Sequence, residues 1–489
     1  MSTSPELPTE IWLRIAEFIP DDHFSTLGRV CRLFYQVEAE RKYRHLVLDD
    51  DRPAAINAHL DRIEKQSLVM PLVNSISLYP RAVRSACLRS GRSQKKSLKK
   101  ANHRGWPASF RTQTAECSIP EDLNLADRLL TGISTFPNVR ILHVEWERPC
   151  APEAPFCFPF LTALWPSLGQ RLTTLSLETG LDAMSRLVEN ASLLPLMQVL
   201  RLTIGPNMIN PDGVDEASQQ QKSLASFING TSSTLVELSI SSIEHFRLCT
   251  LYNELRLFPH LRSLSLHLPF DPLHLDDPKG MNSFLRVHAG IITKLSFIPT
   301  HCCKRADGLW KASLTAWPDP DAWLPQLFAG IRFDNLETLE LGLNTAGGEG
   351  RVLQATRYIG AVINNLGCLK ITGVLTSTED LLFIVRPFTQ KGNVPPKKVV
   401  LEVHVLSRLF LETIATILPD LETLQLTYRW IDKAGSSNEA SFLRDMEGRY
   451  YARWKLKELS LHCSHSKDDG RWASQLVISR TIPAYTRRI

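Results

Sequence analysis

The chain has 489 residues, of which 43% are hydrophobic and 22% charged, and its formal net charge is +5. That length exceeds one ordinary compact core, so we expect several domains or a repeat array, and the hydrophobic content excludes a wholly disordered chain. The ten cysteines include no C-x-x-C pair, and no apolar run approaches the roughly 20 residues that span a bilayer. With no signal peptide visible, we expect a cytoplasmic or nuclear protein without a membrane partner.

The first segment, residues 4–48, has the spacing of short amphipathic helices. Pro8 and Glu10 favour a helix start, because proline in the first turn costs no hydrogen bond and an acidic side chain there complements the helix dipole. Apolar residues expected on one face of this helix are Ile11, Ile15, Phe18 and Ile19. A second helix is predicted from Leu27, Val30, Cys31, Phe34 and Val37. A unit this small cannot bury all of these side chains, so it either docks a partner or caps a larger domain.

The order of residues in this segment resembles the F-box motif. The family's pattern runs L-P-x-E-I-L-x-x-I-F-x-x-L, a short acidic turn, then L-x-x-V-C-R-x-W. This sequence has Leu7-Pro8-x-Glu10-Ile11-x-x-x-Ile15-x-x-Phe18-Ile19 and Leu27-x-x-Val30-Cys31-Arg32-x-Phe34. It departs from the pattern through apolar replacements at Trp12, Ala16 and Phe34. The continuation Arg41-Lys42-Tyr43-Arg44 followed by Leu46-Val47-Leu48 is similar to F-box proteins that are numerous in mushroom-forming fungi.

The resemblance implies a partner and a role for the whole chain. An F-box docks onto the Skp adaptor and, through it, the cullin of an SCF-type ubiquitin ligase. The positions that match the family's contact pattern are Leu7, Pro8, Ile11, Ile15, Leu27 and Val30. The remainder of the chain would then hold an unknown protein substrate while other subunits deliver ubiquitin.

A strongly basic segment follows a connector at residues 49–80. Between Arg81 and Arg111 the sequence contains ten Lys or Arg residues and no acidic residue. We expect a disordered insertion over residues 81–116, because few large apolar side chains are present to be buried. The run from Lys95 to Lys100 fits either a solvated loop or a patch for nuclear import or nucleic acid. Since the positive charge is confined to one segment, we do not expect nucleic acid to be the main ligand.

Short blocks of the form L-x-x-L-x-L recur over residues 117–489. The clearer copies are Val139/Leu142/Val144, Leu172/Leu175/Leu177, Met197/Leu200/Leu202, Leu235/Leu238/Ile240, Leu261/Leu264/Leu266, Ile292/Leu295/Phe297, Leu336/Leu339/Leu341, Leu366/Leu369/Ile371, Leu421/Leu424/Leu426 and Leu456/Leu459/Leu461. A weaker copy at Val73/Ile76/Leu78 would make the connector a first repeat, and another copy is expected near Val399 to Val403. Helical spacing at 182–194, 223–229, 355–365 and 406–418 suits the return segments between strands.

These blocks alternate leucine with Thr, Ser, Glu and Arg, which favours stacked repeats over a doubly wound sheet with its continuous Val and Ile runs. Asn344 alone occupies the asparagine position that normally follows such a block, so the asparagine ladder of regular repeats is largely missing. The predicted fold class is therefore α/β: a small N-terminal all-α F-box (4–48) followed by an irregular leucine-rich-repeat solenoid (117–489).

Two groups of residues are candidates for substrate contact. Residues between the inward leucines face the concave surface of a solenoid, and here they are Arg201, Thr203, Ser263, Ser265, His267, Glu340, Gln425 and Ser460. Two longer excursions are rich in aromatic residues, namely Trp310, Trp317 and Trp323, and Trp430, Tyr450, Tyr451 and Trp454. Clustered Trp and Tyr suit recognition sites, with core packing as the alternative. We select Trp310, Trp317 and Trp430 as substrate-binding candidates.

The sequence lacks the usual signatures of catalysis. H-E-x-x-H, G-x-S-x-G, P-loop and G-x-G-x-x-G motifs do not occur, and Gly347-Gly348-Glu349-Gly350 lacks the lysine of a phosphate cradle. His301-Cys302-Cys303 has no second ligand pair to complete a tetrahedral metal site. We therefore expect a non-enzymatic adaptor without cofactor or metal. Two alternatives stay open: a leucine-rich-repeat scaffold acting outside a ubiquitin ligase, and a nucleic-acid-associated factor that uses the basic segment.

Overall fold

The computed structural model describes a large part of the chain in two compact units, Met1–Leu200 and Arg201–Ile489. We call them the N-terminal and the C-terminal unit and describe each by itself. The described residues are 8–20, 23, 26–27, 32–65, 69–80, 82–83, 85, 123–145, 157–189, 194–205, 214–242, 248–269, 278–300, 326–342, 366–375, 377–386, 394–431, 446, 451 and 453–463.

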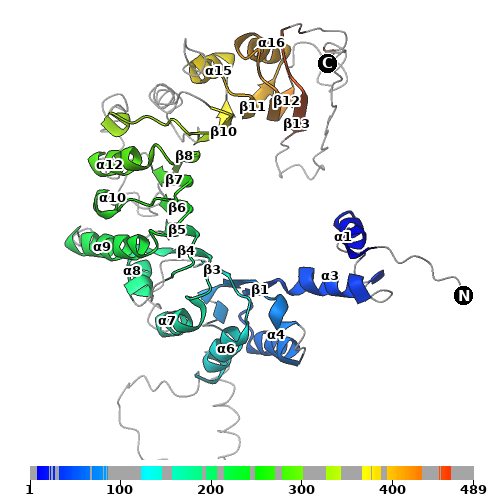
Figure 1. Ribbon diagram of the computed structural model, residues 1–489, viewed down its shortest axis with the longest axis vertical. Coiled ribbons are helices and arrows are strands. Elements are labelled where there is room, and N and C mark those ends of the chain that lie inside the picture. The colour runs from blue at the N-terminus through cyan, green and yellow to red at the C-terminus, as the bar shows by residue number, and fades with distance from the viewer. Residues whose placement is uncertain are drawn as a thin grey trace, which may run out of the picture. The chain divides into compact units, whose positions relative to one another are not determined.

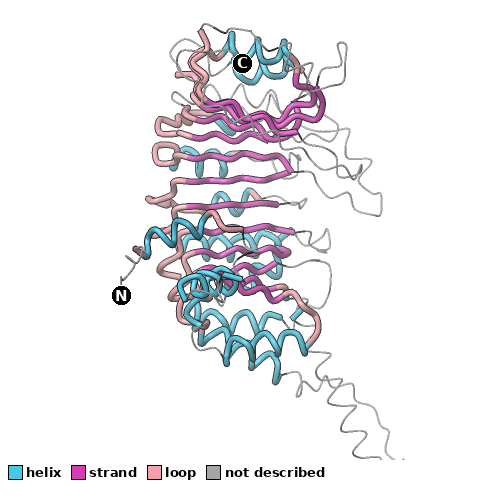
Figure 2. Tube along the Cα trace, turned by 90° about the vertical axis from the view of Figure 1, so that its right-hand side faces the viewer, coloured by secondary structure: helices cyan, strands magenta, loops and turns pink. Residues whose placement is uncertain are grey.

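The described strands form one sheet in which each strand pairs with the next along the chain, from β1 to β13. Pairs with a described register run parallel, from β1 to β4 and from β6 to β13. Figure 2 shows neighbouring strands stacked one on the next. Parallel strands in chain order, each followed by a return segment, are the architecture of stacked repeats. The predicted α/β fold with a parallel sheet is confirmed.

The N-terminal unit begins with helices and continues into the sheet. Its helices are α1 (Thr9–Glu17), α3 (Arg32–Tyr43), α4 (Pro53–Lys65), the 3-10 helix η1 (Met70–Leu72), α6 (Leu123–Thr135), α7 (Cys157–Leu168) and α8 (Leu181–Glu189). Its strands are β1 (His45–Leu48), β2 (Ser75–Leu78), β3 (Ile141–Glu145) and β4 (Thr174–Gly180). One row of register partners runs through buried Leu46, Ile76, Leu142 and Leu175. This row is the core of the stacked strands.

The C-terminal unit repeats the same plan, and β5 (Val199–Gly205) lies across the boundary between the two units. Its further strands are β6 (Glu237–Ser242), β7 (Ser263–Pro269), β8 (Lys294–Thr300), β9 (Thr338–Gly342), β10 (Cys368–Leu375), β11 (Lys398–Leu406), β12 (Thr423–Ile431) and β13 (Glu458–Cys463). The return helices are α9 (Val214–Gly230), α10 (Cys249–Glu254), α12 (Lys279–His288), α15 (Thr378–Val385) and α16 (Arg408–Ile417). Helices α9, α10 and α12 lie along one face of β6 to β8, and no described helix covers the opposite face (Figure 1). We call the open face that side of the strands on which the side chains alternating with the buried leucines lie.

A repeated backbone motif joins most of the neighbouring strands at their N-terminal ends. The carbonyl of Arg44 accepts the N–H groups of Asn74 and Ser75, at 2.9 and 3.0 Å. The same two-donor arrangement recurs at the carbonyls of Asn74, Arg140, Thr173, Val236, Arg262, Thr293, Glu337, Gly367, Lys397 and Glu422. One repeat buries about three leucine-type side chains, which contribute about 1.5–3 kcal/mol each. This cannot offset the conformational entropy of about 30 residues at roughly 1–2 kcal/mol each. The repeats are therefore stable only when stacked.

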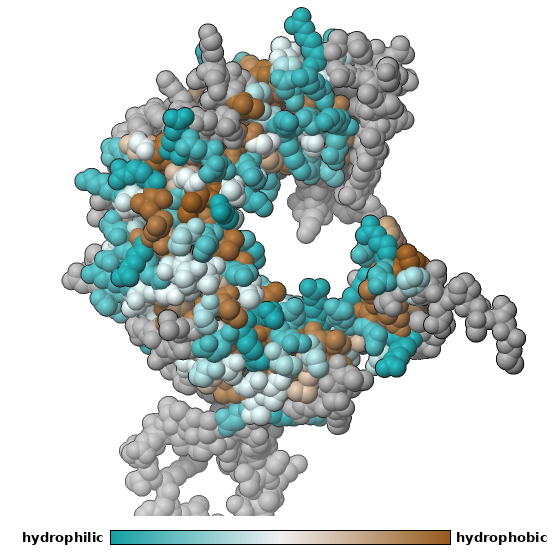
Figure 3. Space-filling model, in the orientation of Figure 1, coloured by the Kyte–Doolittle hydropathy of each residue, from teal (hydrophilic) through white to brown (hydrophobic). Residues whose placement is uncertain are grey.

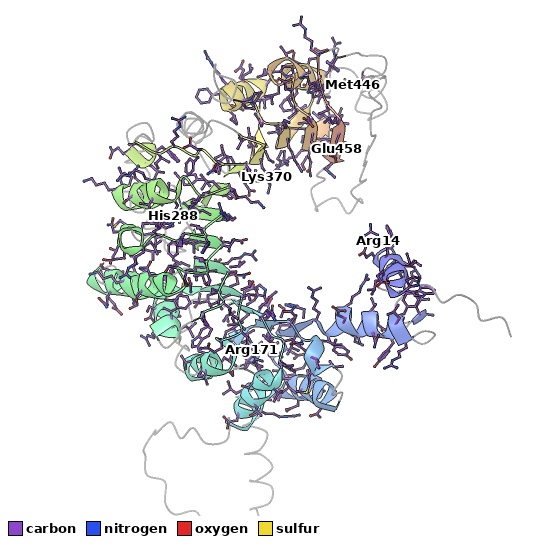
Figure 4. All side chains as sticks on the ribbon, in the orientation of Figure 1. Arg14, Arg171, His288, Lys370, Met446 and Glu458 are labelled. Carbon is purple, nitrogen blue, oxygen red and sulfur yellow. The ribbon has the colours of Figure 1, made fainter. Side chains whose placement is uncertain are left out.

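Side chains at the turns before the strands take over the role of the missing asparagine ladder. Asn138 Nδ2 donates to the Pro71 carbonyl at 2.7 Å, and Asn335 Nδ2 donates to the Gly290 carbonyl at 2.6 Å. Arg171, labelled in Figure 4, donates from Nη1 to the Phe136 carbonyl at 2.8 Å. Each bond links one repeat to the preceding one, so polar side chains stabilise the stack at positions other than that of Asn344.

Most of the predicted strand blocks are found where they were expected, including the weak copy at β2 and the additional one at β11. Strand β1 was not predicted, because Leu46 and Leu48 were assigned to the F-box range 4–48. Their side chains are buried beside those of Ile76 and Leu78, so the sheet begins at His45.

Other predictions meet the structure only in part. Ala82 and Val83, inside the range expected to be a disordered insertion, are buried helical residues, and the rest of that range beyond Ser85 lies outside the described residues. Helix α9 is longer than the predicted 223–229 because polar residues form its first turns. The predicted helix at 355–365 lies outside the described residues.

Candidate functional site

Helix α1 packs one face against α3 and leaves another exposed. Ala16 and Phe34 are buried, and the partly buried side chains Trp12, Ile19, Leu27 and Val37 pack against them. The rings of Trp12 and Phe34 meet edge to face with 5.6 Å between centroids. Ile19 had been predicted to share a face with Ile11, which was wrong. Helix α1 ends at Glu17, so the helical spacing does not extend to Ile19, which packs against the buried pair Ala16 and Phe34 instead.

The stripe of α1 next to the packed face is apolar and in contact with solvent. Ile11, Ile15 and Phe18 keep 46%, 38% and 76% of their surface exposed. Pro8, one turn before Ile11, is also exposed. Figure 3 shows hydrophobic surface over α1. Buried apolar area stabilises a fold, so side chains held out on a short helix contribute only if another molecule covers them.

The edge of this stripe carries a small charged group. Arg14 forms an ion pair with Glu17, and its guanidinium carbon lies 5.7 Å from the centre of the Phe18 ring. Figure 4 labels Arg14 on α1. A cation over an aromatic face holds that ring in place, so Phe18 is partly oriented although it is exposed.

The six residues expected to contact the Skp adaptor differ in their exposure to solvent. Pro8, Ile11 and Ile15 lie together on the exposed stripe. Leu27 is partly buried against the cluster around Phe34. Leu7 and Val30 lie outside the described residues.

A direct connection joins this helical pair to the sheet. Arg41 Nη2 donates to the Ala16 carbonyl at 3.0 Å, which fastens the end of α1 to α3. The Arg44 N–H donates to the Glu40 carbonyl at 2.8 Å, and the Arg44 carbonyl begins the backbone ladder to β2. Arg44 therefore belongs at once to the last turn of α3 and to the first rung of the sheet, with no linker between them.

The eight predicted surface residues of the repeats all lie on the open face, alternating with the buried leucines, and none of them is buried. In the middle of the C-terminal unit, Glu340 Oε1 pairs with Lys370 Nζ at 2.6 Å and Glu340 Oε2 accepts from Ser296 Oγ at 3.2 Å. Lys370 projects from β10 away from the helices (Figure 4). Burial lowers the pKa of His267, whose Nε2 lies 2.9 Å from Ser265 Oγ, while the Glu340 carboxylate raises it to a lesser extent.

The aromatic candidates divide into an exposed and a buried group. Trp430, near the end of β12, is 57% exposed, and its register partner on β11 is Val405, 36% exposed. Trp454 is buried against the Tyr451 ring, with 5.5 Å between centroids, so its place is in the core. Trp310 and Trp317, with Trp323 and Tyr450, lie outside the described residues.

Among the described residues, no group of three or more His, Cys, Asp or Glu side chains is arranged to hold a metal ion. In the same part of the chain, no helix is both long and apolar enough to cross a membrane.

Comparisons with known proteins do not assign the chain to a family. No protein-family model and no curated protein matches the sequence. A match among solved structures is "Crystal structure of TLR13-ssRNA13 complex", at 14% sequence identity and a TM-score of 0.31, covering 68% of this chain and 37% of that chain. The chain thus spans well under two thirds of the length of that solved chain. The F-box resemblance has no counterpart among these matches and stays a prediction.

Proposed function

We propose that the chain is a substrate-recognition adaptor of an SCF-type ubiquitin ligase, in which α1 and α3 dock onto the Skp adaptor and the repeats bind a protein target. The observation that carries the proposal is the exposed stripe of Pro8, Ile11, Ile15 and Phe18 on a helix whose other face is packed. Pro8, Ile11 and Ile15 are positions where the sequence matches the F-box pattern.

The energetics fit a docking surface built on a preformed helix. Covering three large apolar side chains contributes roughly 5–9 kcal/mol at about 1.5–3 kcal/mol each. Association costs on the order of 4–15 kcal/mol, so binding requires a helix that is already ordered before contact and further contacts beyond these three. The packing of Trp12 and Ala16 on Phe34 and the bond from Arg41 to Ala16 support that order.

The open face of the sheet supports the second half of the proposal. Its ion pairs and hydroxyl groups are held on rigid strands, as in repeat proteins that bind extended partners along their length. Glu340, Lys370 and Ser296 form one fixed group of this kind. Trp430 adds an exposed aromatic side chain at a strand end, the residue type that dominates protein interfaces. The chain itself makes or breaks no bond in this mechanism.

The test is recovery of the Skp adaptor with the purified full chain. Replacing Ile11 and Ile15 together by alanine removes several methylene groups from the stripe. We expect a loss of about 3–5 kcal/mol, which is at least a hundredfold in Kd. Leu13→Ala is the matched control, because Leu13 is on the same helix and is 46% exposed, as Ile11 is, yet points about 160° away from Ile11.

Equal adaptor recovery by the double variant, by Leu13→Ala and by the unaltered chain, with all three folded, would overturn the adaptor role. In that case the stacked repeats would be a protein-binding scaffold outside the ligase.

A further inference from the structure

A single buried histidine joins two consecutive repeats of the C-terminal unit. His288 ends α12, and its side chain is fully buried. Its Nε2 accepts the backbone N–H of Phe258 at 2.9 Å, and Phe258 belongs to the preceding repeat, just before β7. Its Nδ1 lies 2.7 Å from the Phe284 carbonyl, one turn earlier in α12. Both bonds can form only when the ring is neutral with its proton on Nδ1.

Aromatic rings close around this imidazole. Phe258 stacks on it with 5.5 Å between centroids and 26° between the ring planes, and the Phe284 ring lies 4.4 Å away. Figure 4 labels His288 at the end of α12. The His288 carbonyl also accepts the N–H groups of Ile291 and Ile292, which begin the approach to β8. The residue thus fastens the end of a helix, the turn before β7 and the turn before β8.

The charged side chains on the described surrounding elements are exposed. They are Glu254 on α10, Arg256 and His260 beside Phe258, Arg262 before β7, Lys279 and Arg286 on α12, and Lys294 on β8. Tyr252 on α10 is a titratable neighbour that is buried against Phe284, and Cys249 lies on the same helix. Among these described residues no buried anion is present to stabilise an imidazolium, and a second proton on Nε2 would face the Phe258 N–H, donor against donor.

We propose that His288 is an acid-sensitive latch between the repeats of β7 and β8, so that protonation opens this junction before the rest of the C-terminal unit. Three neighbouring groups would be released together: the Phe258 N–H, the N–H groups of Ile291 and Ile292, and the rung in which the Arg262 carbonyl accepts Thr293 and Lys294. Opening of this latch would allow the part of the open face on β7 to separate from the part on β8.

The direction of the pH dependence follows from the burial. Burial lowers the pKa of His288 below its usual value, and the hydrogen bond to Phe284 opposes this only in part. In the opened state the ring titrates normally, near about 6.5, so opening takes up a proton. The closed junction is fully stable above that value and weakens as the pH falls from about 6.5 toward the lowered pKa. At pH 5.5 the opening equilibrium rises by up to about tenfold.

Amide hydrogen exchange of the full chain at pH 7.5 and about pH 5.5, with labelling times matched for intrinsic exchange, tests the latch. We expect protection at Phe258 and at residues 291–294 to fall several-fold more on acidification than at Glu422 and Thr423. Those two amides donate to the Lys397 carbonyl in the same rung geometry, and the described segments 394–400 and 418–423 around this rung contain no histidine. His288→Gln, which keeps an acceptor but does not titrate, should abolish this difference, whereas His260→Gln should retain it.

A second measurement applies even if His288→Gln does not fold. Exchange of the imidazole C2 hydrogen of His288 in the unaltered chain reports its pKa, which should lie below the ordinary histidine value of about 6.5. A pKa of His288 at or above that ordinary value, or an equal acid response at residues 291–294 and 422–423, would overturn the proposal.

Discussion

The Trp12 and Phe34 rings meet edge to face across the α1–α3 interface, 5.6 Å apart, and Ala16 lies in the same cluster. These three residues stand at positions where the sequence departs from the F-box pattern. The pattern has Leu, Phe and Trp where this chain has Trp, Ala and Phe. At position 12 tryptophan stands in place of the smaller leucine, and at position 16 alanine stands in place of the larger phenylalanine. Such paired changes conserve volume in a packed core.

This packing predicts that the three exchanges depend on one another. Ala16→Phe alone places a ring where Ala16 is 2% exposed, and overpacking of this kind costs about 1–3 kcal/mol. The triple variant Trp12→Leu, Ala16→Phe, Phe34→Trp should recover much of that loss, with a coupling of about 0.5–3 kcal/mol. Amide exchange of α1 in the full chain measures the local free energy of opening. Additive effects of the three single variants would show that the side chains do not share one core.

The strands could be predicted because the leucine pattern of each repeat lies within a few consecutive residues. Two inward residues, such as Leu339 and Leu341, recur with the same spacing in every copy, and parallel register then aligns them. Strand β1 obeys the same rule, with Tyr43, Leu46 and Leu48 at the three positions, but those residues also continue a helical motif. Where two patterns overlap on one segment, spacing cannot decide between them, and packing against β2 does.

Contacts between repeats were beyond sequence reasoning. Whether Glu340 meets Lys370 depends on the alignment of β9 with β10. The spacing between equivalent strand positions ranges from 25 residues, Val399 to Leu424, to 66 residues, Ile76 to Leu142, which is too variable to fix that alignment. The same limit applies to α9, where Gln221 Oε1 accepts the Leu251 N–H at 3.0 Å inside the structure. Where a polar residue stands in place of an apolar one at a buried contact, the sequence shows no hydrophobic periodicity from which that contact could be predicted.

A like-charged pair on the open face of the N-terminal unit predicts a stabilising substitution. Glu145 and Glu178 are register partners on β3 and β4. Partial burial, and to a lesser extent Glu145, raise the pKa of Glu178. A carboxyl group whose pKa is raised on folding destabilises the fold once it is ionised, and this penalty disappears as the pH falls through the raised pKa. Glu178→Gln should therefore raise stability at pH 7 by a few tenths to about 1 kcal/mol, allowing for solvent screening, and should have no effect near pH 4.

Denaturant unfolding at both pH values measures this difference. Glu237→Gln is the contrasting control, because the Glu237 carboxylate pairs with Arg201 at 2.8 Å and its loss should lower stability by about 0.2–1 kcal/mol. A loss of stability at pH 7 in Glu178→Gln would mean that the carboxylate has a favourable contact.

The side-chain amide of Asn229 connects α9 to the turn that leads to β7. Its Nδ2 donates to the Glu254 carbonyl at 2.8 Å, and its Oδ1 accepts the Arg256 N–H at 2.9 Å. Asn229→Ala loses both bonds and should cost about 1–3 kcal/mol. Asn229→Asp keeps the acceptor but sets a carboxylate against the Glu254 carbonyl, so it should also destabilise at pH 7 and less so when protonated at pH 4. Thermal unfolding of both variants at the two pH values checks this, and an aspartate variant as stable as the unaltered chain at pH 7 would contradict it.

The two tryptophans of the last repeats offer a paired test of surface against core. Trp430 is 57% exposed and Trp454 only 3%. Trp454→Ala should cost about 3–5 kcal/mol, because it empties a packed site beside Tyr451. Trp430→Ala should change the free energy of unfolding by no more than about 0.5 kcal/mol, since an exposed side chain contributes little. Should Trp430→Ala nonetheless remove proteins that co-purify with the full chain while adaptor recovery is unchanged, Trp430 would act in target binding. A destabilisation equal to that of Trp454→Ala would instead place Trp430 in the core.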